Sequence, residues 1–323
     1  MRLLITGGSG FIGTNAVAVF AGLTDHILNL DIQLPLDPSQ EKYWQKCDIM
    51  GQEELVAAFT AFSPTHCIHM AARTECDEKT TVEEGYRVNT VGTENVLAAV
   101  KACQSLERLI VVSSQFVCGP GPLPASDTDY YPHTVYGQSK VITEQLTRVA
   151  GLSCEWTIVR PTNVWGPWHL RYVREAWRTI RLGWYLHPGG APVIRSYAYV
   201  GNVVWQMAQI LAADRDLVRE TVFYLGDRPV NIREWVDAFS LALRGRRVRV
   251  VSRSILRGIG LVGDVATRLG IDFPLTSSRV KSMTTNYLTP MDKTFDAFGV
   301  PPYTLEKGVR ETVGWMQDRS DAG

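Results

Sequence analysis

The sequence has no excess of either charge, no long apolar run and no signal-like leader. Its 323 residues include 33 basic and 33 acidic side chains, so the formal net charge is zero. This balance gives no support to a nucleic acid or an anionic membrane as the main partner. Every uninterrupted apolar stretch is shorter than the roughly 18 residues that a membrane-spanning helix needs, and no basic region precedes an apolar segment at the start of the chain. We therefore expect a cytoplasmic protein without a membrane span.

Cysteine is sparse and never closely paired. Six cysteines stand singly at positions 47, 67, 76, 103, 118 and 154. None belongs to a Cys-x-x-Cys pair of the kind used in metal binding or thiol exchange. We expect reduced thiols, no disulfide and no metal site. The apolar fraction of 45% is ample for a sizeable core, and the length suits one large domain or two fused ones.

An apolar strand runs directly into a glycine-rich turn near the N-terminus, where residues 3–13 read Leu-Leu-Ile-Thr-Gly-Gly-Ser-Gly-Phe-Ile-Gly. Gly7 allows a tight turn, Gly10 lets the backbone approach a pyrophosphate, and Gly13 lets the next helix pack closely on the strand. A helix that starts near Phe11 directs its free N–H groups and the positive end of its dipole at the phosphates. The segment predicts a dinucleotide-binding site.

The second predicted strand, residues 26–31, ends in Asp31. An acid about 20 residues beyond the glycines accepts hydrogen bonds from the adenosine ribose hydroxyls. A carboxylate here repels a 2′-phosphate, and neither Ile32 nor Gln33 supplies an arginine to hold one. The pattern favours NAD over NADP. The alternative is that Asp31 only caps a loop.

The first half of the chain alternates strands and helices. Strands are predicted at 2–6, 26–31, 65–70, 107–113 and 154–160, and helices at 11–22, 52–62, 82–103 and 134–150. This alternation predicts an α/β fold, a doubly wound parallel sheet of the Rossmann type. We expect a dinucleotide-binding domain at 1–165. A smaller, interrupted substrate-binding region follows at 166–317, with some chain returning to the first domain, and 318–323 form a frayed tail.

Tyr136 and Lys140 lie four residues apart in a predicted helix and therefore share one face. A free tyrosine has a pKa of ~10. A nearby ammonium, together with the cationic nicotinamide ring, would lower it and make Tyr136 a general acid or base. Ser114 ends the predicted strand 107–113 at the same sheet edge and can hydrogen-bond the substrate oxygen on which Tyr136 acts. The alternatives are a surface Tyr/Lys pair and a serine that merely terminates the strand.

Motifs in a fixed order link nearly the whole chain to a known family. They are Thr6-Gly-Gly-Ser-Gly-Phe-Ile-Gly13, Cys47-Asp-Ile49, His69-Met-Ala-Ala72, Asn89-Thr-Val-Gly-Thr93, Ser113-Ser-Gln-Phe-Val-Cys-Gly119, Tyr136-x-x-x-Lys140, Arg160-Pro-Thr-Asn-Val-Trp-Gly-Pro167 and Leu305-Glu-Lys-Gly-Val-Arg-Glu-Thr312. With them the chain resembles the extended short-chain dehydrogenase/reductases, NAD-dependent epimerase/dehydratase family, close to the UDP-galactose 4-epimerase group.

The resemblance implies a role for individual residues. Besides Gly7, Gly10, Gly13 and Asp31, it assigns cofactor contacts to Phe11, Ile12, Asp48, Ile49, Ala71, Ala72, Asn89, Tyr136, Lys140 and Pro161. It assigns catalysis to Ser114, Tyr136 and Lys140, and substrate contacts to Ser114, Asn163 and Arg195, the last with the substrate diphosphate. It also implies a homodimer formed through the helices at 82–103 and 134–150.

Departures from the family pattern narrow the reaction. Sugar-nucleotide dehydratases of this superfamily place Asp-Glu directly after the catalytic hydroxyl, whereas Gln115 and Phe116 follow Ser114 here. Reductive epimerases place a cysteine there, but Cys118 stands four residues further on. Elimination is therefore disfavoured. We interpret the chain as an NAD-dependent nucleotide-sugar epimerase, with a UDP-sugar as substrate and C4 as the reacting centre.

Other departures keep alternatives open. The segment Tyr199-Val-Gly-Asn-Val203 resembles that of 3β-hydroxysteroid dehydrogenase-like proteins, so a net NAD-dependent oxidoreductase of an apolar alcohol is the second hypothesis. A non-catalytic NAD-binding sensor is the third. A second diphosphate-binding cation is not evident, with Arg279 or Lys281 as candidates. The apolar stretch Ile255–Val265 is interpreted as a core helix, with a pocket wall as the alternative. Trp168, His169 and Arg174 are the residues expected to select the sugar and the nucleotide. For His169, the preferred interpretation is a helix-start residue without a ligand role.

Overall fold

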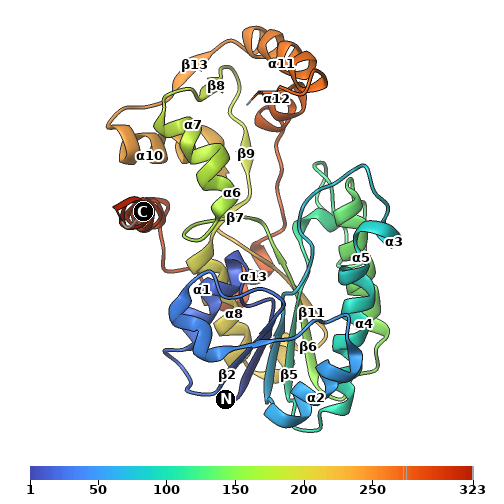
Figure 1. Cartoon of the computed structure of the whole chain (residues 1–323). Helices are drawn as coiled ribbons and strands as arrows, with labels where there is room; N and C mark the ends of the chain where they lie inside the picture. Colours follow the sequence, from blue (N-terminus) through green and yellow to red (C-terminus); the bar gives the residue numbers. More distant parts are fainter. Residues whose placement is uncertain (272, 274, 322–323) are drawn as a thin grey trace.

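The computed structural model describes residues 1–271, 273 and 275–321. Its centre is a seven-stranded sheet of parallel strands in the order β11-β6-β5-β4-β1-β2-β3 (Figure 1). The strands are β1 (Leu3–Thr6), β2 (Ile27–Asp31), β3 (Trp44–Lys46), β4 (His66–His69), β5 (Arg108–Val112), β6 (Glu155–Pro161) and β11 (Thr221–Leu225). The predicted α/β fold with a Rossmann-type sheet is confirmed.

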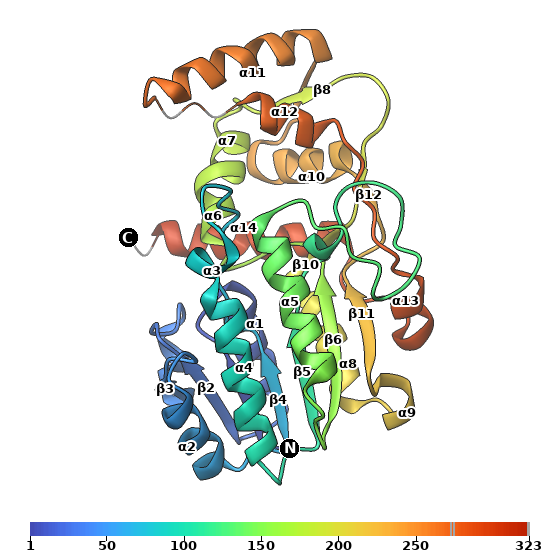
Figure 2. The ribbon, with the colours of Figure 1, turned by 90° about the vertical axis from the view of Figure 1, so that its right-hand side faces the viewer.

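Helices cover both faces of this sheet (Figures 1 and 2). One face carries α1 (Phe11–Phe20) and α8 (Val200–Ala212), and the other carries α2 (Gln52–Phe62), α4 (Arg87–Ala102) and α5 (Val135–Val149). Because neither face meets water, the central strands are continuous apolar runs, and all four residues of β1 are buried. The carboxyl ends of the strands point toward the second, upper part of the molecule.

The five predicted strands are found with their ends within one residue of the expected positions. β3 and β11 were not predicted. β3 is three residues of mixed polarity, and β11 follows the predicted end of the first domain. The predicted helix 82–103 is divided into α3 (Val82–Gly85) and α4, because the backbone of Tyr86 leaves the helical region. The buried phenol of Tyr86 accepts a hydrogen bond from the Asp77 backbone N–H.

The upper part is built from short elements that surround the carboxyl edge of the sheet (Figure 1). Its strand pairs are β7 (Asn163–Trp165) with β10 (Tyr197–Tyr199), β9 (Ile194–Arg195) with β12 (Val230–Asn231), and β8 (Leu186–Pro188) with β13 (Arg249–Val251). Its helical segments are α6 (Leu170–Tyr172), the π-helical turn Val173–Trp177, α7 (Arg178–Arg181), α10 (Ile232–Arg244), α11 (Arg253–Arg268) and α12 (Ser277–Met283).

The remaining elements are helical. They are the 3₁₀ turns Pro38–Tyr43 and Gln115–Val117 and the helices α9 (Arg215–Val218), α13 (Asp292–Phe298) and α14 (Leu305–Asp321). Residues 318–321, expected as a frayed tail, continue α14, and 322–323 lie outside the described residues. No helix within the described ranges is long and apolar enough to cross a membrane.

Candidate active site

The glycine-rich turn closes against the loop that follows β4. Gly7 has φ +78°, and a Cβ on it would lie 2.5 Å from the Ala71 backbone nitrogen. A Cβ on Gly13 would lie 2.4 Å from the Gly7 carbonyl oxygen, so both positions require glycine. Gly10 precedes α1, no side chain caps this helix start, and the nearest atom to a Cβ on Gly10 is 3.5 Å away. Backbone N–H groups at an uncapped start with open space in front fit a pyrophosphate.

Asp31, at the end of β2, lies beside this turn. Its carboxylate accepts hydrogen bonds from the backbone N–H groups of Ser9 and Gln33, each at 3.0 Å. Asp31 therefore does cap local backbone, as the loop alternative held, but it is half-exposed. Each carboxylate oxygen has a second lone pair, so ribose hydroxyls can still be accepted.

Asn89 holds the wall of the site rather than presenting a free amide. Its Oδ1 accepts from the Arg73 N–H at 2.8 Å, and its Nδ2 donates to the Arg73 carbonyl and to the Ser139 Oγ. These bonds fix the loop that begins with Ala71 and Ala72 at the carboxyl end of β4.

Further along the sheet edge, Ile49 is buried and Asp48 is exposed. The Asp48 carboxylate accepts a hydrogen bond from the Met50 N–H.

Ser114 and Tyr136 meet at the carboxyl edge of β5. Thr134 caps α5 by accepting from the Gly137 N–H, and this places Tyr136 in the first turn, with its ring 5.9 Å from that of Phe116. Tyr136 is buried, which raises the pKa of its phenol, while a hydrogen bond from the Ser114 hydroxyl lowers it. Phe116 adjoins both side chains, because its backbone N–H donates to Ser114 Oγ at 3.2 Å and its ring packs on Tyr136.

Lys140 lies one turn further along α5, but its ammonium is not directed at Tyr136. Its Nζ donates to the Val112 carbonyl at 2.8 Å. Burial lowers the pKa of Lys140 to about 8, and the nearby Glu144 raises it. Burial of the phenol is the largest cause of the raised pKa of Tyr136, and Lys140 is not among the causes. A lower pKa of Tyr136 through Lys140 and a bound nicotinamide ring stays a prediction.

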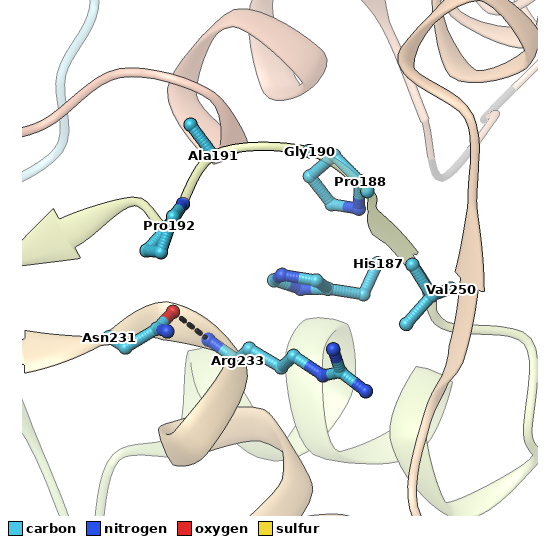
Figure 3. A pocket seen from close by; sticks show the side chains of 9 residues that line it. His187, Pro188, Gly190, Ala191, Pro192, Asn231, Arg233 and Val250 are labelled. Carbon is cyan, nitrogen blue, oxygen red and sulfur yellow. Dashed lines mark hydrogen bonds between the residues drawn. The ribbon is translucent and has the colours of Figure 1, made fainter.

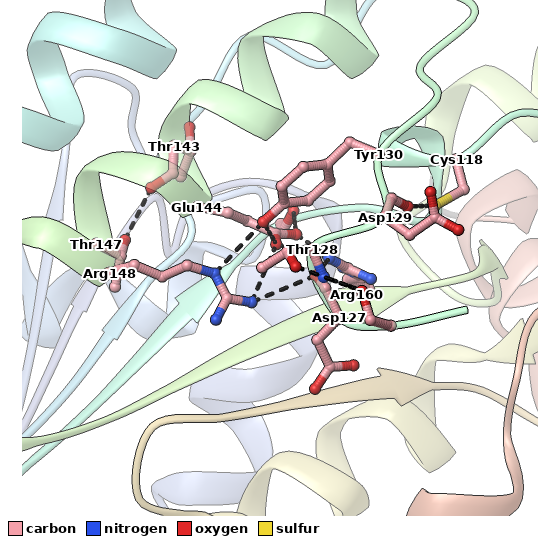
Figure 4. A network of polar contacts seen from close by, with 12 residues as sticks. Cys118, Asp127, Thr128, Asp129, Tyr130, Thr143, Glu144, Thr147, Arg148 and Arg160 are labelled. Atoms are coloured by element: carbon pink, nitrogen blue, oxygen red, sulfur yellow. Dashed lines mark hydrogen bonds and ion pairs between the residues drawn. The ribbon is translucent and has the colours of Figure 1, made fainter. Parts of the chain in front are cut away.

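A buried ion pair fastens α5 to β6 behind these residues (Figure 4). The carboxylate of Glu144 accepts from Arg160 Nε at 2.8 Å and Nη2 at 2.7 Å, and both side chains are fully buried. The same carboxylate accepts from the hydroxyls of Ser113, at 2.6 Å, and Tyr130, at 2.9 Å. Sequence reasoning missed this pair, because Glu144 and Arg160 come from different elements. It positions Ser113, the neighbour of Ser114, relative to α5.

The upper part contains a cavity of about 410 Å³. Its wall is mainly aromatic and aliphatic, and it includes Arg195 and Arg279. The structure therefore brings one of the two proposed second cations, Arg279, to the same cavity as Arg195. Arg195 donates to the backbone carbonyls of Thr285, at 3.2 Å, and Ser282, at 2.7 Å.

A chain of contacts joins this cavity to the catalytic residues. Arg195 forms a β-bridge with Tyr287, whose ring lies 6.2 Å from that of Phe116, which in turn packs on Tyr136. The cavity is lined by neither Ser114 nor Tyr136. It therefore lies beyond Arg195 and suits the part of a substrate that is distant from the reacting carbon.

The remaining residues that were expected to contact cofactor or substrate have mainly structural contacts. Asn163 Nδ2 donates to the Ser196 carbonyl at 3.5 Å, and Pro161 ends β6. His169 accepts from the Tyr172 N–H and caps α6, as its helix-start interpretation held. The ring of Trp168 packs on Trp315 of α14. Neither Trp168 nor His169 lines the large cavity.

The unusual segment at 199–203 is explained by packing. Asn202 Nδ2 donates to Asp227 Oδ1 at 2.7 Å and to the Tyr303 carbonyl at 2.8 Å, and Asn202 Oδ1 accepts from the Tyr303 N–H. A Cβ on Gly201 would lie 2.6 Å from the Tyr199 ring. Asn202 and Gly201 therefore join α8 to the segment before α14, with no contact that requires a steroid substrate.

A smaller cavity of about 130 Å³ lies nearby in the upper part, between the 187–192 loop and α10 (Figure 3). His187 and Arg233 line it, and the Arg233 N–H donates to Asn231 Oδ1. Burial, with the nearby Arg233, lowers the pKa of His187. The lining residues include no carboxylate.

Comparison with known proteins agrees with this geometry. The chain is 26% identical to N-acetyl-alpha-D-glucosaminyl-diphospho-ditrans,octacis-undecaprenol 4-epimerase of Escherichia coli O157:H7, over 97% of this chain and 94% of the relative. It is 24% identical to 3-beta-hydroxysteroid dehydrogenase of Mycolicibacterium neoaurum, over 99% and 92%. The Thermus thermophilus UDP-glucose 4-epimerase, solved in complex with NAD, superposes with a TM-score of 0.73 at 22% identity, over 98% of this chain and 99% of that one.

Residues 3–226, the greater part of the chain, match the family described as NAD dependent epimerase/dehydratase family. That span includes the glycine-rich turn, Asp31, Ser114, Tyr136 and Lys140. The uncapped start of α1 provides the cradle that the cofactor of this family requires. The protein is therefore an enzyme of the NAD-dependent epimerase/dehydratase family, an extended short-chain dehydrogenase/reductase, and its cofactor is NAD.

Proposed function

We propose that the protein inverts C4 of a sugar carried on a diphosphate, with a transient ketone at that carbon. The observation that carries this proposal is the placement of Ser114 and Tyr136 beside Phe116, whose N–H donates to Ser114 Oγ and whose ring packs on Tyr136, at the sheet edge where the glycine-rich turn also ends. A nucleotide sugar, with UDP as the nucleotide, is the substrate that the sequence motifs favour.

Each residue has a defined task in this proposal. Tyr136 takes the proton of the C4 hydroxyl as the hydride leaves C4, and Ser114 donates a hydrogen bond to the same oxygen. NAD, held at the glycine-rich turn and Asp31, would supply the acceptor for that hydride and the donor that restores it on the opposite face of the ketone. Lys140 is held by the Val112 carbonyl. Its pKa is about 8, so most of its amines are protonated at pH 7 and place a positive charge beside the site.

The residues after Ser114 support epimerisation over elimination. Loss of water from the sugar requires an acid and a base beside the reacting carbons, whereas this chain has the amide of Gln115 and the phenyl ring of Phe116 there. A ketone without a route to elimination is reduced again, so the cofactor is not consumed. The alternative, net oxidation of an apolar alcohol, predicts instead that reduced cofactor accumulates.

Arg195 and Arg279, which line the same cavity, support a diphosphate carrier, because guanidinium groups bind phosphate oxygens in a planar, bidentate way. Two relatives are named for epimerisation of a sugar on a diphosphate, one on undecaprenol and one on UDP. Both carriers therefore belong in the assay.

The decisive experiment follows the sugar and the cofactor together. Purified protein is incubated with UDP-, dTDP-, GDP- and CDP-sugars, a polyprenyl-diphosphate sugar and a 3β-hydroxysteroid, without added NADH. Sugar products are identified by NMR, and reduced cofactor is followed by its absorbance. A C4 epimer without net NADH supports the proposal, whereas stoichiometric NADH with an oxidised substrate contradicts it.

Replacing Tyr136 with Phe removes the proton acceptor and leaves the ring in place. We expect turnover to fall by about 10²–10⁴-fold, with NAD binding retained. Tyr303→Phe is the matched control, because its ring lies against Tyr199 and not against Ser114. Near-normal turnover by Tyr136→Phe would contradict the assigned role.

We also propose that the enzyme works in the cytoplasm as a homodimer paired through α4 and α5, which pack side by side on one face of the sheet. Sedimentation at micromolar concentration tests this assembly, and a monomer there counts against it.

A further inference from the structure

Helix α11 presents an apolar stripe to the outside of the molecule. One face of the helix is buried through Leu256, Gly260 and Gly263. The opposite face exposes Ile255, Leu261, Val262, Val265 and Leu269. Their spacing of three, four and seven residues aligns them along one side of the helix. The stretch Ile255–Val265 was interpreted as a core helix, but several of its apolar side chains are exposed. It is not simply a pocket wall either, because Ile259 alone of this stretch lines the cavity.

The segment of the chain that contains this stripe is strongly basic. Residues 244–268 contain seven arginines and a single acid, Asp264, which gives a local charge of 7 − 1 = +6 in a chain of zero net charge. The arginines are Arg244, Arg246, Arg247, Arg249, Arg253, Arg257 and Arg268. The chain is neutral overall, yet this segment is strongly basic. The argument from net charge against an anionic partner therefore does not hold for this segment.

The stripe also occupies an outer position in the molecule. Figure 2 shows α11 lying across the top of the upper part, at the end opposite the N-terminus. Trp184, 64% exposed, lines the same cavity as Ile259 of α11. Indole rings favour the boundary between water and lipid. Exposed apolar residues, one indole and arginines therefore gather on the same end of the protein.

We propose that α11 docks the protein on the surface of an anionic phospholipid bilayer. A helix in this position inserts its apolar stripe among the lipid chains near the headgroups, while flanking arginines reach the phosphates. A second copy of the chain fits less well, because a two-fold contact through this face sets the patch against itself and brings the like-charged Arg257 and Arg268 together with their copies. The anionic surface complements the +6 segment.

Docking gives the adjoining cavity a defined orientation. Ile259 and Trp184 line it on the side of α11, and Arg195 lines it on the side of the catalytic residues. If the proposed function holds, the diphosphate at Arg195 continues into a mainly apolar space that α11 adjoins. This consequence rests on the proposed function and favours a lipid as the carrier of the sugar, whereas the docking itself does not depend on the reaction.

Vesicle flotation of the full chain with NAD, and without any sugar, tests the docking. We expect binding to vesicles of phosphatidylcholine with phosphatidylglycerol, weakened by added salt because ions screen the arginines, and much weaker binding to phosphatidylcholine alone. Leu261→Asp/Val262→Asp should lower the partition coefficient by at least about tenfold. Arg257→Ser/Arg268→Ser should lower it less and reduce its dependence on salt.

The chain offers a closely matched control. Leu23 and Val300 are each 62% exposed, against 63% for Leu261 and 62% for Val262, and both lie in other parts of the fold. Leu23→Asp/Val300→Asp should therefore bind vesicles as the wild type does. NAD binding and circular dichroism establish that each variant is folded.

Two results would overturn the proposal: wild-type protein that ignores the anionic vesicles, or equal binding by the α11 variant and its control. Conversion of a dimer to a monomer by Leu261→Asp/Val262→Asp, with no vesicle binding by the wild type, would assign the stripe to a second copy instead. Tyr136→Phe should still bind vesicles, so failure of the proposed epimerisation and failure of docking are separable.

Discussion

Replacing Glu144 with Gln tests whether the buried ion pair fastens the catalytic helix to the sheet. The Glu144 carboxylate accepts four hydrogen bonds, two from Arg160 and one each from Ser113 and Tyr130. The amide of Gln is neutral and has only one oxygen, so the fully buried Arg160 loses its counter-charge and at least one acceptor. Breaking a buried pair from one side costs about 3–5 kcal/mol, and we expect the free energy of unfolding to fall by that amount.

Urea unfolding followed by tryptophan fluorescence measures this change. Glu220→Gln is the control, because Glu220 is exposed and lies 3.7 Å from Arg219, a pair for which a loss below about 1 kcal/mol is expected. The single variants Glu144→Leu and Arg160→Leu and the double variant Glu144→Leu/Arg160→Leu form a separate cycle, in which the double variant should cost less than the sum of its two single variants. A Glu144→Gln loss below about 1 kcal/mol, or strictly additive single variants, would refute the role assigned to the pair.

Two further predictions concern buried polar groups. Burial, with the nearby Lys140, lowers the pKa of His69 to about 3. The unfolded chain therefore binds a proton that the folded chain does not, so stability should be lost as the pH falls from about 6.5 towards 3. His69→Gln should flatten that part of a pH–stability profile, and an unchanged profile would contradict the assignment. Gln115 is fully buried, and neither polar atom of its amide has a hydrogen-bond partner among the described residues. Gln115→Met should raise the free energy of unfolding by about 1–3 kcal/mol in urea titrations, whereas a loss of stability would indicate a partner for the amide.

Local patterns were sufficient for the cofactor half of the protein. The run of apolar residues before Gly7 dictates a buried strand, and the spacing of Gly7, Gly10 and Gly13 dictates a turn that admits no Cβ at its first and last positions. Asp31 and the separation of Tyr136 from Lys140 are equally local signals. Strand ends were predicted within one residue because Gly, Pro and polar residues bound each apolar run.

Contacts between distant residues could not be predicted in the same way. The ion pair of Glu144 and Arg160, the direction of the Lys140 ammonium and the raised pKa of Tyr136 all depend on which groups tertiary packing places together. Likewise, β11 is an ordinary apolar segment whose membership in the sheet depends on α8 returning the chain to β6.

The sequence by itself determined five of the seven strands, the glycine-rich turn and the three side chains proposed for catalysis, because each depends on spacing along one element and on the side-chain chemistry found there. Only the tertiary structure decided that Arg195 and Arg279 share a cavity beyond the catalytic residues, and that α11 turns its apolar stripe outward. An amphipathic pattern shows that a helix has an apolar face but not what covers it. Whether the apolar face is buried or exposed depends on which other elements of the folded chain pack against it.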